Sequence, residues 1–121
     1  MQTATKVNHR TATAASGSPV TVLAFSGDIS STSKDAVLGA YHHLNGAGAA
    51  VLLDFTDVDY INSSGIAIII QMLMEANKSA SKPIGIYGLT PHFQKVFTMV
   101  GITKYTSLHP DEKAACAAFV D

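Results

Sequence analysis

Two adjacent serines followed by a glycine form the most chemically suggestive segment of this sequence. Ser63 and Ser64 belong to Asn62-Ser63-Ser64-Gly65, which leads directly into an apolar run that ends near Met74. A serine hydroxyl before such a run can cap a helix or act as a nucleophile. A hydrolase nucleophile would require a Gly-x-Ser-x-Gly elbow, and no glycine lies two residues before either serine. The residues alone therefore favour helix capping.

Two carboxylates near the preceding apolar run are the next candidates for chemistry. Asp54 and Asp57 follow residues 51–53, which read as a buried strand, and α/β proteins place their sites at the carboxyl ends of strands. Because no base, nucleophile or metal partner is evident beside them, we interpret both as solvated loop residues. A small enzyme that uses Ser63 with these carboxylates is kept as an alternative. It would lose turnover in Ser63→Ala and keep its fold.

The histidines and the single cysteine show no metal-ligand spacing. They are His9, His42, His43, His92, His109 and Cys116. Neighbouring residues on a helix do not share a face, so the adjacent pair at 42 and 43 cannot bind one ion together. The cysteine lies among alanines, which predicts a small buried apolar residue in a reducing compartment. We expect no metal site and no cofactor.

Composition limits the class of protein. The chain has 121 residues, 47% hydrophobic residues and a formal net charge of −1. These values predict one folded domain and argue against a nucleic-acid-binding surface. The longest apolar run is about half of what a membrane helix needs, and no apolar signal-peptide core is present at the start. We therefore expect a cytoplasmic protein without membrane insertion; the sequence does not define its oligomeric state.

Residues 1–17 are expected to form a flexible arm or an edge strand near residues 6–13, and residues 18–121 the domain itself. The expected strands are residues 20–25, 51–55, 84–89 and 105–108. The expected helices begin near Thr32, Ser63, Thr90 and Pro110. The order (β)βαβαβα(β)α predicts an α/β fold with a mostly parallel sheet and about four helices.

Several local signals set the expected boundaries. Thr32 and Asp35 have the spacing of a capping box, and Asn45-Gly46 and Ser81-Lys82-Pro83 are helix-stop and breaker signals. Residues 56–62 read as a connecting loop. The helix of residues 63–77 is apolar almost all round, which predicts a buried helix.

The stretch of residues 51–66 resembles the central signature of STAS domains, the family of the bacterial anti-sigma factor antagonists. In that family a strand ending in Asp and a hydrophobic residue leads through a short loop to Asp-Ser-Ser/Thr-Gly, which here is Asn62-Ser63-Ser64-Gly65. Gly27-Asp28-Ile29 resembles the family's turn after the second strand. Two further segments also match. They are Phe93, Phe97, Val100 and Gly101 in the third helix, and Asp111-Glu112-Lys113-Ala114 at the start of the last helix. The resemblance covers about residues 18–119 and implies a STAS-type fold.

The resemblance implies a partner-switching regulator of transcription without catalysis. Such a chain binds an anti-sigma factor that is also a serine kinase and so frees a sigma factor. The kinase then phosphorylates the motif serine, here Ser63 with Ser64 as second choice, and a phosphatase resets the switch. The implied partner-binding residues are Asp28, Ile29, Ser30, Asn62, Ser63, Ser64, Gly65 and Ile66.

Three positions depart from the family pattern. Asn62 stands where regulated members usually carry Asp, Ala67 where glycine is common, and Ser30 where Asp is common. Asn is nearly isosteric with Asp and caps helices well, but it removes one negative charge beside Ser63. A second STAS interpretation is a subunit of a membrane lipid-transport complex, held against an ATPase. It predicts stable co-purification with that ATPase and no dependence on a kinase.

Overall fold

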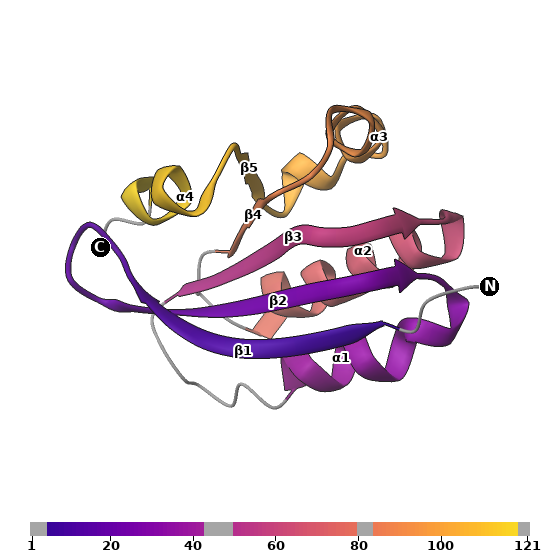
Figure 1. Cartoon of the computed structure of the whole chain (residues 1–121), viewed down its shortest axis with the longest axis horizontal. Coiled ribbons are helices and arrows are strands. Elements are labelled where there is room, and N and C mark those ends of the chain that lie inside the picture. Colours follow the sequence, from indigo (N-terminus) through magenta and orange to yellow (C-terminus); the bar gives the residue numbers. More distant parts are fainter. Residues whose placement is uncertain (1–4, 43–49, 80–83, 119–121) are drawn as a thin grey trace.

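The structure is a computed structural model that describes residues 5–42, 50–79 and 84–118. The expected order of strands and helices is confirmed (Figure 1). Along the chain the elements are β1 (Lys6–Thr13), β2 (Pro19–Ile29), the 3-10 helix η1 (Ser31–Ser33), α1 (Lys34–His42), β3 (Ala50–Ile61), α2 (Ser63–Ser79), β4 (Ile84–Tyr87), α3 (Pro91–Met99), the 3-10 helix η2 (Ile102–Lys104), β5 (Ser107–His109) and α4 (Glu112–Ala118).

The five strands form one mostly parallel sheet in the order β1-β2-β3-β4-β5, as the sequence predicted. β2 pairs parallel with β3, β3 with β4 and β4 with β5, and each of these connections carries a helix. The segment expected as an arm or an edge strand forms β1, which pairs antiparallel with β2. In this pairing Lys6 lies opposite Ser26 and Thr13 lies opposite Pro19.

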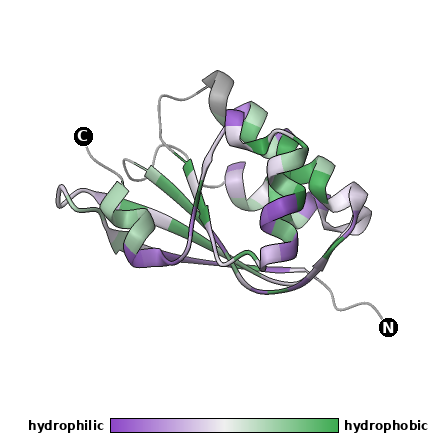
Figure 2. Cartoon of the chain, turned by 90° about the horizontal axis from the view of Figure 1, so that it is seen from above, coloured by the Kyte–Doolittle hydropathy of each residue, from purple (hydrophilic) through white to green (hydrophobic). Residues whose placement is uncertain are grey.

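The main hydrophobic core lies between one face of the sheet and α1, α2 and α3. In Figure 1 α1 and α2 lie together behind β1–β3, and Figure 2 shows hydrophobic colour concentrated in the strands and the helices beside them. Fully buried side chains of this core include Leu23, Phe25, Leu53, Phe55, Ile69, Met72, Ile86 and Phe97. Phe55 joins the layers, because its ring packs edge-on against Phe25 and Phe97.

A smaller core occupies the opposite face of the sheet and is covered by α4. Successive residues of a strand point to opposite faces of the sheet. Val22 and Leu52 therefore point to the face opposite Leu23 and Leu53. Both are fully buried, together with Val20 and Ala115 of α4. The free thiol of Cys116 packs against this cluster and is partly rather than fully buried.

The segment of residues 56–62 is not the loop that we expected. β3 continues to Ile61, because Val58, Tyr60 and Ile61 pair with Gly27, Asp28 and Ile29 of β2. The register shifts twice along this pairing, which lets the two strands stay paired although their side-chain alternation is irregular. The strand thus reaches the residue before Asn62 and brings the serine segment to the end of β2.

Local features at the ends of α1 and α2 differ from the expected ones. The capping box lies at Ser30–Ser33 rather than Thr32–Asp35, because the Ser30 N–H donates to Ser33 Oγ at 2.9 Å. A 3-10 turn precedes α1. α2 is apolar all round but not buried all round, because Met74 is 42% exposed. The signals at Asn45-Gly46 and Ser81-Lys82-Pro83 lie outside the described residues.

The start of α3 is confirmed in detail. Thr90 accepts a hydrogen bond from the Phe93 N–H at 3.3 Å, and Pro91 occupies the first helical position. Phe93 and Phe97 are the buried residues of this helix. Within the described residues, none of the helices has the length and apolar character to cross a membrane.

Candidate functional site

The serine segment lies at the carboxyl ends of β2 and β3, where α2 begins. Ile29 and Ile61 are register partners at the ends of these strands. The next backbone N–H, that of Asn62, donates to Ile29 O at 3.1 Å and so ties the start of α2 to the end of β2. Carboxyl ends of parallel strands are where open α/β sheets place their binding sites.

Asn62, not a serine, caps α2. Its Oδ1 accepts a hydrogen bond from the Gly65 N–H at 2.8 Å, and its backbone carbonyl accepts from the Ile66 N–H at 2.9 Å. Ser63 and Ser64 are therefore the first two residues of the helix, and both side chains are exposed. The interpretation of the serines as caps is wrong, because Asn62 already supplies the oxygen that the N-terminal N–H groups need.

Gly65 is required by close approach of two backbones. A Cβ at this position would lie 2.2 Å from Ile29 O and 2.7 Å from Ile29 C. The first turn of α2 therefore presses directly on the end of β2. This contact fixes where the exposed serines stand relative to the strand ends.

Burial divides the eight candidate partner-binding residues. Ser63 and Ser64 are exposed, and Asp28, Asn62 and Ile66 are partly exposed. The others lie below the surface: Ile29 is fully buried, Ser30 is 4% exposed and Gly65 is buried. The buried three can position the site, while direct contact by side chains is left to the other five.

Hydroxyl groups hold the turn that follows β2. Thr5 Oγ1 contacts both the Asp28 carbonyl and Ser33 Oγ, and Ser33 Oγ also donates to the Asp28 carbonyl at 3.3 Å. Ser30 Oγ lies 3.1 Å from Thr32 Oγ1. Ser30 thus replaces the family's Asp with a side chain that is used inside the turn.

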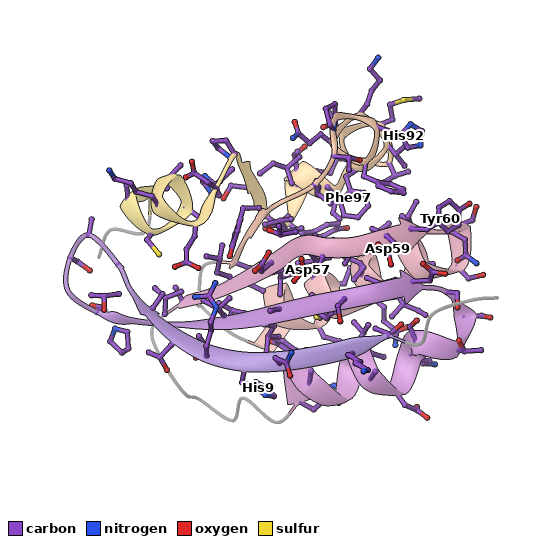
Figure 3. All side chains as sticks on the ribbon, in the orientation of Figure 1. His9, Asp57, Asp59, Tyr60, His92 and Phe97 are labelled. Atoms are coloured by element: carbon purple, nitrogen blue, oxygen red, sulfur yellow. The ribbon has the colours of Figure 1, made fainter. Side chains whose placement is uncertain are left out.

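The surface before the serines was missed by the sequence reading. Tyr60 is 54% exposed although it lies in a strand, and its ring packs edge-on against Phe93 with centroids 6.2 Å apart. Asp57 and Asp59, also exposed, precede it on β3, and Figure 3 shows all three along the strand below α3. Because we expected residues 56–62 to form a loop, no strand register was available to place these three side chains.

A second polar cluster lies beside α4, on the face of the sheet that points away from the main core. The Arg10 guanidinium donates to Tyr87 Oη at 2.9 Å, pairs with the Glu112 carboxylate, and lies 3.8 Å from Asp54 Oδ2. Tyr87 Oη donates to Glu112 Oε1 at 3.1 Å. Asp54 is therefore not a loop residue, and its Oδ1 accepts from both the N–H and the hydroxyl of Thr56.

Proton affinities in this cluster follow from its contacts. The hydrogen bond from Arg10 holds the pKa of Glu112 below its ordinary value, and the same bond raises the pKa of the Arg10 guanidinium. Burial and the nearby Asp54 carboxylate raise the pKa of Tyr87. At neutral pH the cluster is thus one fixed set of charges that fastens α4 to β1 and β4. Burial also raises the pKa of Cys116, which disfavours a reactive thiolate.

Two surface hollows among the described residues lie away from the serine segment. One, of about 450 Å³, lies between residues 11–15 and α4, and another of about 380 Å³ runs along the outer side of α3 from Pro91 to Met99. In the part of the chain that the structure describes, no three His, Cys, Asp or Glu side chains are placed to hold a metal ion. Ser63 and Ser64 are exposed, so another macromolecule can reach both hydroxyls.

Known proteins share this fold and a family signature. Residues 12–110 match the family model described as "Mlab, STAS domain". No curated protein matches the chain in sequence. An anti-sigma factor antagonist from Mycobacterium paratuberculosis is 19% identical with a TM-score of 0.70, and the match covers 91% of each chain.

Two further solved structures agree. The RsbS protein of Moorella thermoacetica, solved with a serine-to-glutamate substitution, is 13% identical with a TM-score of 0.66, covering 88% of this chain and 90% of that one. The Bacillus cell fate determinant SpoIIAA in its phosphorylated form is 14% identical with a TM-score of 0.60, covering 89% and 96%. At these identities the likeness shows the fold, while the family model spans most of the chain. The chain therefore belongs to the STAS domain family.

Proposed function

We propose that this protein is an anti-sigma factor antagonist that acts in the cytoplasm by binding an anti-sigma factor with serine kinase activity. In this proposal phosphorylation of Ser63 ends the binding, a phosphatase restores it, and the cycle regulates transcription without catalysis by this chain. The observation that carries the proposal is the exposed Ser63 at the first position of α2, at the carboxyl edge of a STAS sheet. Solved relatives of the fold include anti-sigma factor antagonists and a phosphorylated one.

The first turn of α2 can accept a phosphate without unfolding. The cap of Asn62 uses the Gly65 N–H, and the N–H groups of Ser63 and Ser64 have no acceptor among the described residues. A phosphate at Ser63 adds about −1.5 to −2 charges. The positive end of the helix dipole stabilises such charge by roughly 0.3–1 kcal/mol at an exposed position. The modified chain should therefore keep its fold.

The same charge should be costly for a bound partner. A partner surface shaped around a neutral hydroxyl would have to bury an unpaired dianion, and burying unpaired charge costs several kcal/mol. Since 1.4 kcal/mol corresponds to about a tenfold change in affinity, phosphorylation can weaken binding by a factor of hundreds or more. Ser63 thus has the position and the chemistry of a binary switch.

Mass spectrometry tests the proposal directly. The chain is incubated with ATP and each purified kinase-type anti-sigma factor of the same organism, and intact mass and phosphosite are then measured. We expect one added phosphate on Ser63, absent in Ser63→Ala and retained in Ser64→Ala. If none of these factors either binds the chain or adds phosphate to it, the proposal is refuted.

A second candidate function is a constitutive binding subunit of a membrane lipid-transport complex, held against its ATPase. The observation that favours it is Asn62, an uncharged residue that is fully used as a helix cap where phosphorylated members usually carry Asp. This candidate predicts stable co-purification with an ATPase in both Ser63→Ala and Ser63→Asp chains. The switch predicts that only the alanine variant keeps its partner.

A further inference from the structure

We infer that the partner contact extends from Ser63 along β3 to an acidic–aromatic surface made by Asp57, Asp59 and Tyr60, with Tyr60 as its apolar anchor. The inference rests on the proposed function and adds the chemistry of the partner. The partner presents an apolar socket for the tyrosine ring, and Lys or Arg side chains line the rim of the socket that faces the two carboxylates.

Tyr60 lies close to the serine segment along the chain and beside the end of β2. It lies three residues before Ser63, and its register partner on β2 is Asp28, one of the partly exposed residues of the candidate site. Tyr60 is 54% exposed, so a large aromatic surface would leave water on binding. Tyrosine is among the side chains most often responsible for binding energy in protein interfaces.

The ring is also held in place before any partner arrives. It packs edge-on against Phe93, with an interplanar angle of 66°, and Phe93 is itself 9% exposed and part of the main core. The Phe93 ring also packs edge-on against the His92 ring, with centroids 5.1 Å apart, and Figure 3 shows His92 on α3. A side chain that is already ordered loses little conformational entropy when it binds, which favours affinity.

The charge around Tyr60 selects the partner. Asp57 and Asp59 are exposed beside Tyr60, and residues 35–77 contain no Lys or Arg. The nearest basic residue by strand register is Lys6 of β1, two strands away, because Lys6 pairs with Ser26 and Ser26 pairs with Asp57. A second copy of the chain would bring like charges together, and an anionic membrane surface would be repelled. A partner with basic groups at the rim complements the two carboxylates.

A partner with a basic rim can still be released by phosphorylation of Ser63. The Asp57 carboxylate precedes Tyr60 along the chain, and the phosphate on Ser63 would follow it. The β2 partners of Asp57 and Tyr60 are two residues apart, which is about 7 Å along a strand, whereas Ser63 follows Tyr60 in the first turn of α2. A phosphate at Ser63 therefore meets the part of the partner beyond the socket and not the rim that faces Asp57.

Titration calorimetry without ATP tests the inference with each purified kinase-type anti-sigma factor of the same organism. We expect Tyr60→Ala to weaken binding at least about tenfold and Tyr60→Phe to stay within about threefold of the parent chain. Asp57→Asn with Asp59→Asn should weaken binding at low salt and flatten its salt dependence. Met99→Ala is the matched control, because Met99 is 80% exposed at the far end of α3.

The outcomes separate this inference from the proposed function. Binding that survives Tyr60→Ala within threefold, while Ser63→Asp abolishes it, overturns the acidic–aromatic surface and leaves the switch intact. Equal losses in Tyr60→Ala and Met99→Ala also overturn it, because the effect would not be local. If no factor binds the parent chain, the proposed function and this inference both fail. Urea midpoints of all variants establish that each chain is folded.

Discussion

The contact between the first turn of α2 and the end of β2 makes a quantitative prediction for Gly65→Ala. The new Cβ would lie 2.2 Å from Ile29 O, and real Cβ contacts are not found below 3.0 Å. Helix and strand must therefore separate by about 0.8 Å, against a backbone carbonyl that cannot rotate away. Ala in place of Gly inside a helix ordinarily stabilises by about 1 kcal/mol, and overpacking costs about 1–3 kcal/mol. The middle of that range, less the helix gain, leaves an expected net loss of about 1 kcal/mol in the free energy of unfolding.

Urea unfolding followed by far-UV circular dichroism measures this loss, with Gly39→Ala as the matched control. Gly39 lies in α1, where an added Cβ meets no atom within 4 Å. The control should therefore gain up to about 1 kcal/mol, so the same substitution has opposite signs in the two helices. If Gly65→Ala is as stable as the parent chain, α2 does not press on β2 and the described placement of Ser63 is wrong.

Two further predictions concern the cap and the α4 cluster. Asn62→Ala should lower the free energy of unfolding by about 1 kcal/mol, because the Gly65 N–H loses its acceptor. Asn62→Asp should keep this free energy or raise it slightly, since Asp accepts the same hydrogen bond. Urea midpoints of the two variants distinguish these outcomes, and equal losses would contradict the capping bond. Arg10 holds the pKa of Glu112 below its ordinary 4.5, so the stabilisation from Glu112 is complete above about pH 4.5 and is lost as the pH falls further. Glu112→Gln should remove this acid-sensitive stabilisation, which is less than about 1 kcal/mol because the pair is partly exposed. If urea midpoints of the variant fall with pH as much as those of the parent chain, the ion pair between Arg10 and Glu112 does not stabilise the fold.

Local patterns in the sequence predicted the elements whose ends carry strong signals. Thr90-Pro91 marks the start of α3, and the apolar run after Ser64 marks α2, because caps and 3.6-residue periodicity act within a few residues. The mostly parallel sheet followed from the alternation of strands and helices. The eight residues chosen for the site do converge on one edge of the sheet, but the sequence could not show that Ile29 and Ser30 are buried there.

What the sequence could not show depends on contacts between distant segments. Residues 56–61 form a strand only because β2 supplies a partner with a shifted register, and polar composition alone favoured a loop. The position of Tyr60 beside Asp28 follows from the same shifted register. The pairing of Arg10 with Glu112 joins residues 102 positions apart, a distance over which periodicity carries no information. Asn62 took the capping role from the serines because α2 begins one residue earlier than a serine cap requires.

A titration that compares two substitutions can show whether charge at Ser63 decides partner binding. Ser63→Ala and Ser63→Asp are each titrated with the kinase-type anti-sigma factor that binds the parent chain, in the presence of ATP. We expect Ser63→Ala to bind and to stay bound, because it cannot be phosphorylated, and Ser63→Asp to show no binding. Equal affinities for the two variants would contradict the phosphate-charge mechanism.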